Sequence, residues 1–186
     1  MTPHTGYQVA AITVLLGCIA LRWASDGLPA WWLPVPIAIT LLGVPLAASD
    51  LTRRRLPNAL TLSAIGVVAG ALVAVAGGAG TMAVLGAAAW GGISLTAAHL
   101  AVHLAAPASL GGGDVKLATS VGAVLGAVGW QAVLLGMLLA SGVAVLLGTA
   151  ARLLRRPCWR DGVPYGPGLL AATWAIVVFP WQWSWA

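Results

Sequence analysis

The residues with the clearest chemical potential are two aspartates, Asp50 and Asp114. The chain has four acidic residues, and all are aspartates. Asp114 directly follows three glycines at the start of an apolar segment, and Asp50 ends another apolar run just before Arg53. A carboxylate within a membrane segment is costly and therefore indicates a function. Two carboxyl groups that share one proton can hydrolyse a peptide bond, because the ionised group activates water while the neutral group polarises the carbonyl.

Each aspartate also has a purely structural interpretation. Asp50 would be a polar residue leaving the membrane among arginines. Asp114 would stabilise the first turn of a helix through the helix dipole, and the glycines before it would form a hinge. The same glycines would equally let a substrate backbone approach a catalytic acid. The two interpretations differ in whether the aspartates meet.

The composition is that of a membrane protein. Hydrophobic residues make up 60% of the chain and charged residues 7%, with a mean hydropathy of +0.96. A soluble domain carries about 25% charged residues. We therefore expect an all-α integral membrane protein with a single membrane-embedded domain over residues 1–186. The net charge of +5 is explained by basic loops on the cytoplasmic side, and no nucleic-acid partner is expected.

The apolar segments predict a bundle of about six to seven transmembrane helices. The proline Pro57 suits the first turn of the third, and a polar loop is expected between Asp50 and Asn58. The predicted helices cover residues 7–24, 31–49, 59–76, 82–105, 114–128, 131–151 and 168–180.

The basic residues predict the orientation of this bundle. If the N-terminus is cytoplasmic, the loops at residues 50–58, 107–116 and 152–167 face inward and hold eight of the nine Lys and Arg residues; only Arg22 lies outside. Asp50 and Asp114 then share the cytoplasmic side. The basic residues of these loops are expected to anchor the chain to anionic lipids. Tryptophans are expected to form a belt at the opposite interface, comprising Trp23, Trp31, Trp32, Trp130, Trp181, Trp183 and Trp185.

Other patterns are less specific. The pairs Gly66–Gly70 and Gly122–Gly126 supply small faces for helix packing. The histidines His99 and His103 have the spacing of metal ligands but no evident third ligand, so a packed, hydrogen-bonded pair is preferred to a metal site. The cysteines, Cys18 and Cys158, form no C-x-x-C pair and predict neither a zinc site nor a disulfide framework. No metal and no cofactor are expected.

Three motifs carry a resemblance to a known family. The residues Gly111-Gly112-Gly113-Asp114 fit the G-x-G-D signature of intramembrane aspartyl proteases, and the continuation Val115-Lys116-Leu117 resembles the type IV prepilin peptidase family. The first aspartate of that family lies in a segment similar to residues 50–58 of this chain, in which Asp50 is followed by Pro57-Asn58. The family's element before the last span is similar to Pro164-Tyr165-Gly166-Pro167. The resemblance covers roughly residues 50–168.

The resemblance implies a membrane aspartyl endopeptidase of the inner (plasma) membrane, with its active site facing the cytoplasm. Such enzymes remove the basic leader of prepilins and pseudopilins, usually after a glycine and before an apolar helix. Asp50 and Asp114 would be the catalytic pair. Gly111 and Gly113 would shape the loop, and Lys116 would be either an interface anchor or a support near the substrate. The partners implied are the precursor substrate and anionic lipids, with no oligomeric state specified.

The chain departs from the larger members of that family. Those members carry a cytoplasmic domain with two C-x-x-C pairs and methylate the new N-terminus, whereas the loops here are short and lack these cysteines. We therefore expect peptidase activity without methyl transfer, as in the peptidases of tight-adherence (Flp-type) pili or archaeal preflagellin peptidases. Tyr165, where the family usually has Phe, is expected to pack and not to do chemistry.

Two other functions remain as alternatives. A different G-x-G-D intramembrane protease would usually show Tyr before the first aspartate, where this chain has Ser49, and Pro-Ala-Leu near the last span. A non-enzymatic transport or assembly subunit would use the two acids for ion coupling. Transporter acids tend to lie near the bilayer midplane, whereas Asp50 and Asp114 are predicted at one face.

Overall fold

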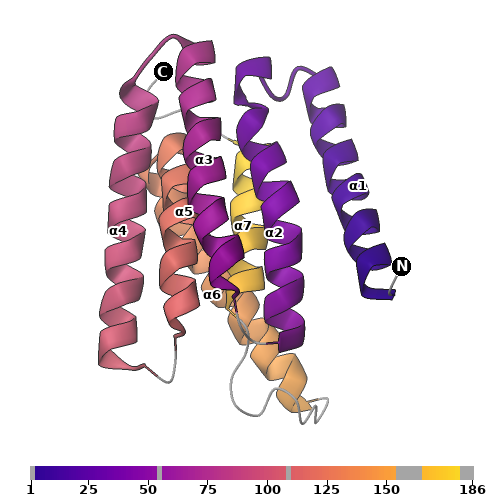
Figure 1. The fold of residues 1–186 in the computed structure, drawn as a ribbon, viewed down its shortest axis with the longest axis vertical. Coiled ribbons are helices and arrows are strands. Elements are labelled where there is room, and N and C mark those ends of the chain that lie inside the picture. Colours follow the sequence, from indigo (N-terminus) through magenta and orange to yellow (C-terminus); the bar gives the residue numbers. More distant parts are fainter. Residues whose placement is uncertain (1–2, 54–55, 108–109, 154–164, 181–186) are drawn as a thin grey trace.

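The protein is a bundle of helices, as expected. A computed structural model describes residues 3–53, 56–107, 110–153 and 165–180, and these residues contain no β-strand (Figure 1). The helices run alternately in opposite directions. They are α1 (Pro3–Ala24), the short 3-10 helix η1 (Ala30–Trp32), α2 (Pro34–Arg53), α3 (Asn58–Ala79), α4 (Ala83–Ala105), α5 (Gly112–Val128), α6 (Trp130–Leu153) and α7 (Gly166–Val178).

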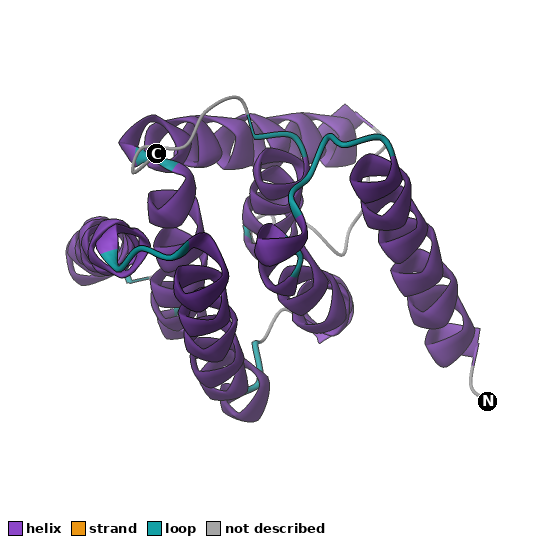
Figure 2. Ribbon diagram, turned by 90° about the horizontal axis from the view of Figure 1, so that it is seen from above, coloured by secondary structure: helices purple, strands orange, loops and turns teal. Residues whose placement is uncertain are grey.

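Two helices in the centre of the bundle, α5 and α7, are shorter than the helices around them. Among the described residues, the segments of α1, α2, α3, α4 and α6 are long and apolar enough to cross a membrane. The helices α5 and α7 have 17 and 13 residues. Both are largely buried, and α5 packs against α3, α4, α6 and α7. The helix α1 lies at one edge of the bundle, against α2 (Figure 2). The prediction of an all-α, multi-pass membrane protein is thereby confirmed.

Glycines bring α4 and α5 into close contact. A Cβ atom on Gly126 would lie 2.5 Å from the carbonyl oxygen of Ala87 and 2.7 Å from the Cα of Gly91. A Cβ on Gly122 would similarly meet the Gly91 carbonyl oxygen at 2.5 Å. The predicted small face at Gly122 and Gly126 therefore packs against α4, with backbone approaching backbone.

The other predicted small face has no packing partner among the described residues. Gly66 and Gly70 on α3 are exposed, and a Cβ on either would have no neighbour within 4 Å. The pattern is the same as in α5, but it points outward from the bundle. For α3 the prediction of close packing by these glycines is wrong within this protomer.

The predicted boundaries are correct to within a few residues, with one informative error. The second helix was expected to end at residue 49, but α2 continues to Arg53 and contains Asp50. The hydroxyl of Thr52 donates to the Ala48 carbonyl at 2.7 Å within this last turn. Helix α3 begins directly after Pro57 and ends before Gly80, whose φ of 69° suits a residue without a side chain. Asp50 thus points from a helix and not from a loop.

The expected tryptophan belt is wrong for Trp32, which is fully buried. Its indole N–H donates to the carbonyl of Val177, in the last turn of α7, at 2.9 Å. Arg22 serves the same helix end: Nε donates to the Val178 carbonyl at 3.4 Å, and the guanidinium lies 4.9 Å from the ring centre of Phe179. Carbonyls at a helix end lack intrahelical partners, so these two side chains complete the short helix α7.

Trp23 and Trp130 are exposed, as a belt requires. Ten residues named in the predictions lie outside the described residues: Arg54, Arg55, Arg155, Arg156, Cys158, Arg160, Pro164, Trp181, Trp183 and Trp185.

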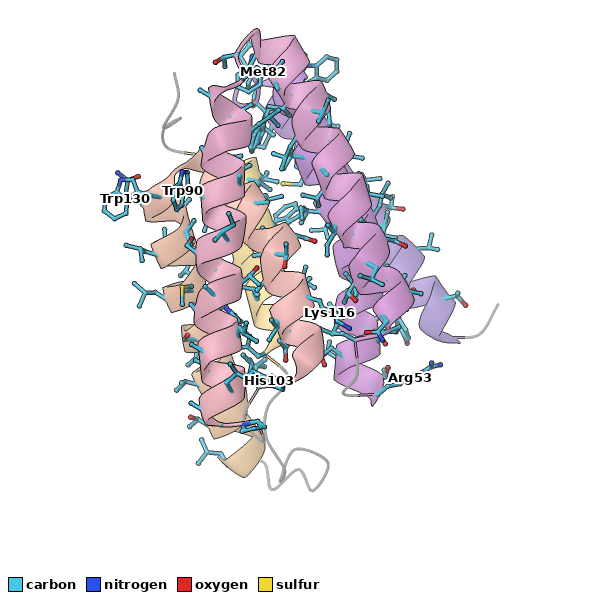
Figure 3. All side chains as sticks on the ribbon, turned by 60° about the vertical axis from the view of Figure 1, so that its left-hand side comes forward. Arg53, Met82, Trp90, His103, Lys116 and Trp130 are labelled. Carbon is cyan, nitrogen blue, oxygen red and sulfur yellow. The ribbon has the colours of Figure 1, made fainter. Side chains whose placement is uncertain are left out.

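Both aspartate-bearing segments lie at the same end of the bundle. Arg53, His103 and Lys116 lie at this end, and Met82 lies at the opposite end (Figure 3). The alternation of helices places the end of α2 and the start of α5 together (Figure 1). That this end faces the cytoplasm stays a prediction from the distribution of basic residues.

The α4–α5 contact predicts a contrast between two conservative substitutions. Gly126→Ala should lower the melting temperature of the detergent-solubilised protein, because the new methyl group meets backbone atoms that cannot rotate away; the expected cost is about 1–3 kcal/mol. Gly66→Ala is the control, and should leave the melting temperature unchanged or raise it slightly, since alanine favours a helix over glycine. Equal melting temperatures for both variants would contradict the close contact.

Candidate active site

Asp50 occupies the last turn of α2 and is 7% exposed. It shares one face of the helix with Gly43 and Ala47, because positions three and seven residues apart lie one above the other. Gly43 approaches α7, since a Cβ there would contact Leu170 at 3.5 Å. The same face therefore directs the Asp50 carboxyl towards the start of α7. The interpretation of Asp50 as a residue leaving the membrane among arginines does not fit this burial.

Asp114 lies in the first turn of α5, where its carboxyl group caps the helix. Its Oδ2 accepts a hydrogen bond from the backbone N–H of Gly111 at 3.2 Å, and its own N–H donates to the Gly111 carbonyl at 3.0 Å. A carboxylate at this position is favoured by the helix dipole. The role of Asp114 in stabilising the first turn of a helix is thus observed. This role uses Oδ2, whereas Oδ1 forms no part of the cap.

The two carboxyl groups meet at Gly166, the first residue of α7. A Cβ atom on Gly166 would lie 2.8 Å from Oδ2 of Asp50 and 3.7 Å from Oδ1 of Asp114. Both carboxyl groups therefore face the same small space, although 64 positions of sequence separate them. Sequence reasoning noted Gly166 within the Pro-Tyr-Gly-Pro element but assigned it no role. The sequence gives only a weak signal for this role, because glycine also starts α5 at Gly112, where a Cβ would have no neighbour within 4 Å.

The glycines before Asp114 differ in their surroundings. A Cβ on Gly113 would lie 2.9 Å from the Cβ of Leu56, so this glycine lets α5 begin close to the segment before α3. Gly111 is exposed and lies next to the Asp114 carboxyl, and Gly112 is exposed with open space around it. One side of this loop is thus packed, and the other is accessible beside the carboxyl groups.

Lys116 links α5 to α3. Its ammonium group donates to the side-chain oxygen of Asn58 at 2.8 Å, and the side chain is partly exposed. Asn58 is the first residue of α3, directly after Pro57. The Pro-Asn pair and the lysine, noted separately in the sequence, therefore form one contact between the two aspartate-bearing segments.

The two histidines of α4 form separate hydrogen bonds. The Nδ1 of His103 lies 2.6 Å from the carbonyl oxygen of Leu110, just before the glycine loop, whereas Nδ1 of His99 lies 2.9 Å from the Leu95 carbonyl oxygen. His103 thereby fixes the loop to α4. Within the described parts of the chain, no group of three or more His, Cys, Asp or Glu residues is placed to hold a metal ion.

Tyr165 precedes α7 and lies close to the carboxyl groups. Its ring centre is 5.6 Å from that of His99. Burial raises the pKa of its hydroxyl group, the hydrogen bond with the Ser141 side chain lowers it, and the negative charge of Asp114 raises it, with burial the largest effect. The net direction is upward, so the phenol stays protonated and acts as a hydrogen-bonded packing group.

Comparison with known proteins places this geometry in a family. The profile of the type IV leader peptidase family matches residues 36–149, a range that includes both aspartates. A protein of Aeromonas hydrophila named prepilin leader peptidase/N-methyltransferase is 31% identical over 171 residues, and its counterpart in Aeromonas salmonicida is 32% identical over 174 residues. These matches cover 90% and 92% of this chain but 57% of each relative, so the chain spans little more than half of their length. No solved structure matches the chain significantly. Since the family profile covers more than half of the sequence and includes the segments that form the carboxyl pair, this chain belongs to the type IV leader peptidase family.

Proposed function

We propose that the chain is an aspartic-type endopeptidase that removes the basic leader of type IV prepilin-like precursors. The observation that carries this proposal is the meeting of Asp50 and Asp114 at Gly166. The names of the related proteins support the substrate class. The peptidase would be a single membrane-embedded domain of the inner membrane, with its carboxyl pair at the cytoplasmic face.

The two carboxyl groups would act as a pair that holds one proton. Like charges a few Å apart oppose full ionisation of both groups, and the shared proton belongs to the pair and not to one residue. The ionised carboxyl takes a proton from water as the water oxygen attacks the scissile carbonyl. The neutral carboxyl donates its proton to the carbonyl oxygen. When the C–N bond breaks, the leaving nitrogen takes up a proton from the pair, and one hydroxyl group of the tetrahedral intermediate returns its proton to the pair, which again holds one proton.

The surroundings of the pair suit an extended substrate. Gly111 and Gly112 are exposed beside Asp114 and carry no side chains, so a substrate backbone can lie close to the carboxyl groups. Gly113 and Lys116 fix the loop from the other side, through Leu56 and Asn58. In this proposal Gly111, Gly113 and Lys116 position the loop, and Asp50 and Asp114 do the chemistry.

Substitution of either aspartate tests the catalytic pair. Asp50→Asn and Asp114→Asn should each reduce cleavage of a co-expressed prepilin by at least about a thousandfold, because a neutral amide can neither activate water nor donate a proton to the carbonyl. The double variant should be no less active than either single variant, since the two groups act as a unit. Processing is measured by the mobility shift of the precursor on a gel.

Asp26→Asn is the matched control. Asp26 lies in the turn between α1 and η1 with a φ of 56°, a conformation that asparagine also tolerates. This variant should process the precursor at the wild-type rate. Full processing by either Asp50→Asn or Asp114→Asn, with normal accumulation of the protein, would exclude the proposed pair.

A methyl group at Gly166 should impair the pair without unfolding the protein. Gly166→Ala places Cβ against the Asp50 carboxyl and should lower kcat by about a hundredfold, as expected for a displacement of about 1 Å in a catalytic group. Gly70→Ala, at an exposed glycine of α3 with open space around it, should retain wild-type activity. Wild-type kcat for Gly166→Ala would show that the carboxyl groups act elsewhere.

Substitutions of Tyr165 test whether this residue contributes through the packing of its ring or through a chemical role of its hydroxyl group. Tyr165→Phe removes the hydroxyl group and its bond to Ser141 but keeps the ring beside His99, so activity should stay within about threefold of wild type. Tyr165→Ala removes the ring and should lower both activity and melting temperature, at a cost of about 3 kcal/mol. A large loss for Tyr165→Phe alone would assign the hydroxyl a chemical role.

A further inference from the structure

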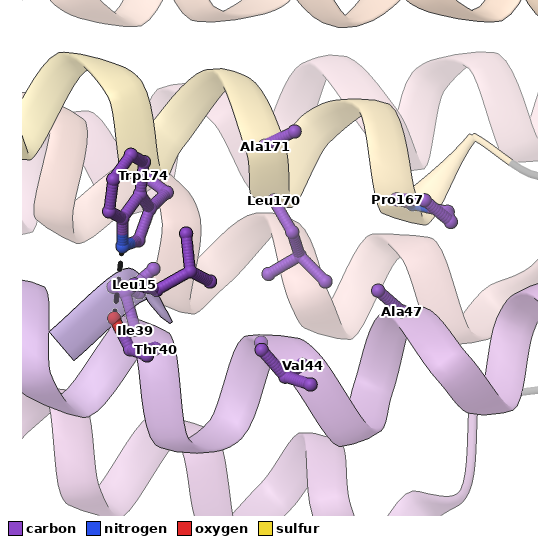
Figure 4. A pocket seen from close by; sticks show the side chains of 10 residues that line it. Leu15, Ile39, Thr40, Val44, Ala47, Pro167, Leu170, Ala171 and Trp174 are labelled. Carbon is purple, nitrogen blue, oxygen red and sulfur yellow. Dashed lines mark hydrogen bonds between the residues drawn. The ribbon is translucent and has the colours of Figure 1, made fainter. Parts of the chain in front are cut away.

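An apolar groove runs along the contact between α2 and α7 (Figure 4). Its volume is about 210 Å³, and a single residue of α1, Leu15, contributes to its wall. Ala171 of α7 lines it and is exposed, so the groove is open at the side of the bundle. The other lining residues are Ile39, Thr40, Gly43, Val44, Ala47, Pro167, Leu170 and Trp174.

One end of this groove lies at the carboxyl pair. Ala47 lines the groove three residues before Asp50, and Pro167 lines it directly after Gly166. On both helices the lining positions recur with the spacing of one helix face. This end of the groove therefore lies beside Asp50 on α2 and directly after Gly166 on α7, although neither residue lines it.

The other end is closed by two polar side chains that bond to each other. The indole N–H of Trp174 donates to the hydroxyl oxygen of Thr40 at 2.9 Å, and this hydroxyl donates to the Pro36 carbonyl at 2.7 Å (Figure 4). These polar groups are used within the protein, which leaves the groove wall apolar. The lining residues of α2 run from Ile39 to Ala47, so the groove extends for about 12 Å along this helix at 1.5 Å per residue.

We propose that this groove binds the apolar helical segment of the substrate that immediately follows the scissile bond. This inference rests on the proposed function, since it assigns a binding site to a segment of the substrate that the carboxyl pair would cleave. An occupant at this depth must be apolar, and its backbone must satisfy its own hydrogen bonds, which a helix does. The groove length corresponds to about eight residues of such a helix.

The small residues along the groove fit a helix as the occupant. Gly43, Ala47 and Ala171 leave room for the side chains along one face of an incoming helix, as small residues do where membrane helices approach closely. A lipid acyl chain matches the apolar wall but does not explain why the groove ends beside Asp50 and Gly166. A substrate helix accounts for both the apolar wall and the position of the groove. The first residue of this helix would lie near Gly166, and the substrate backbone just before it would be extended at the carboxyl pair, where it is cleaved.

Filling the groove tests this assignment. Ala171→Trp should raise KM about tenfold for a full-length prepilin encoded in the same genome, since overpacking costs enough to displace the bound helix. For the same precursor truncated three residues after the scissile bond, kcat/KM should stay within about twofold of wild type, because this substrate never enters the groove. Ala97→Trp, on the exposed face of α4, is the control and should leave both substrates unaffected.

The outcomes separate the two proposals. Wild-type KM of Ala171→Trp for the full-length precursor, or an equal loss for both substrates, would overturn the groove assignment while the peptidase function stands. A wild-type enzyme that cleaves neither substrate would overturn the proposed function, and the groove assignment with it.

Cross-linking gives an independent test that does not depend on a bulky substitution. Cysteine at Ala171, in an Asp114→Asn background without Cys18 and Cys158, should form disulfides with single cysteines along the first eight or so residues of the precursor's apolar segment, with the three-to-four-residue period of a helix face. Cysteine at Ala97 should form none. The absence of cross-links from Ala171, or a lipid that copurifies in the groove and is not displaced by precursor, would overturn the proposal.

Discussion

Two carboxyl groups are held against one backbone position, and the rest of the structure serves this constraint. Like charges repel, so attraction between the side chains cannot bring Asp50 and Asp114 together; helix packing must do it. The last turn of α2 and the first turn of α5 supply the acids, and α7 supplies a residue without a side chain at the point where they meet. The backbone contact between α4 and α5 fixes the helix that carries Asp114.

The short helix α7 is held at both ends. At its start, Tyr165 packs beside His99 and bonds to Ser141; at its finish, Trp32 and Arg22 bind the last carbonyl groups. A helix of 13 residues spans about 20 Å, less than the hydrocarbon thickness of about 30 Å. Its final carbonyls would lack hydrogen-bond donors without these partners. The same helix carries Gly166 and one wall of the groove, so its fixed position serves both.

Sequence alone predicts the helices and the position of both aspartates at one end of the bundle, because lipid imposes the same apolar requirement on every span and the G-x-G-D and Pro-Asn segments are local patterns. It does not predict whether a face of small residues packs against another helix or points away from the bundle. The glycine pairs of α3 and α5 look alike, yet only the pair in α5 meets a partner helix. Nor does it predict the burial of Trp32, whose hydrogen-bond partner lies 145 residues away, or the role of Gly166, which depends on two distant side chains. These features arise from tertiary contacts that leave no periodic signal.

The contacts of Arg22 have a consequence for the order in which the molecule is assembled. This arginine belongs to the first helix, but its carbonyl partner Val178 and its aromatic partner Phe179 belong to the last. During synthesis, the first span therefore enters the membrane with a charged side chain whose only early partner among these contacts is the Gly27 carbonyl, at 3.1 Å. The bundle closes only when α7 arrives, so that a chain truncated before the last helix would keep α1 without its tie to the far end of the molecule.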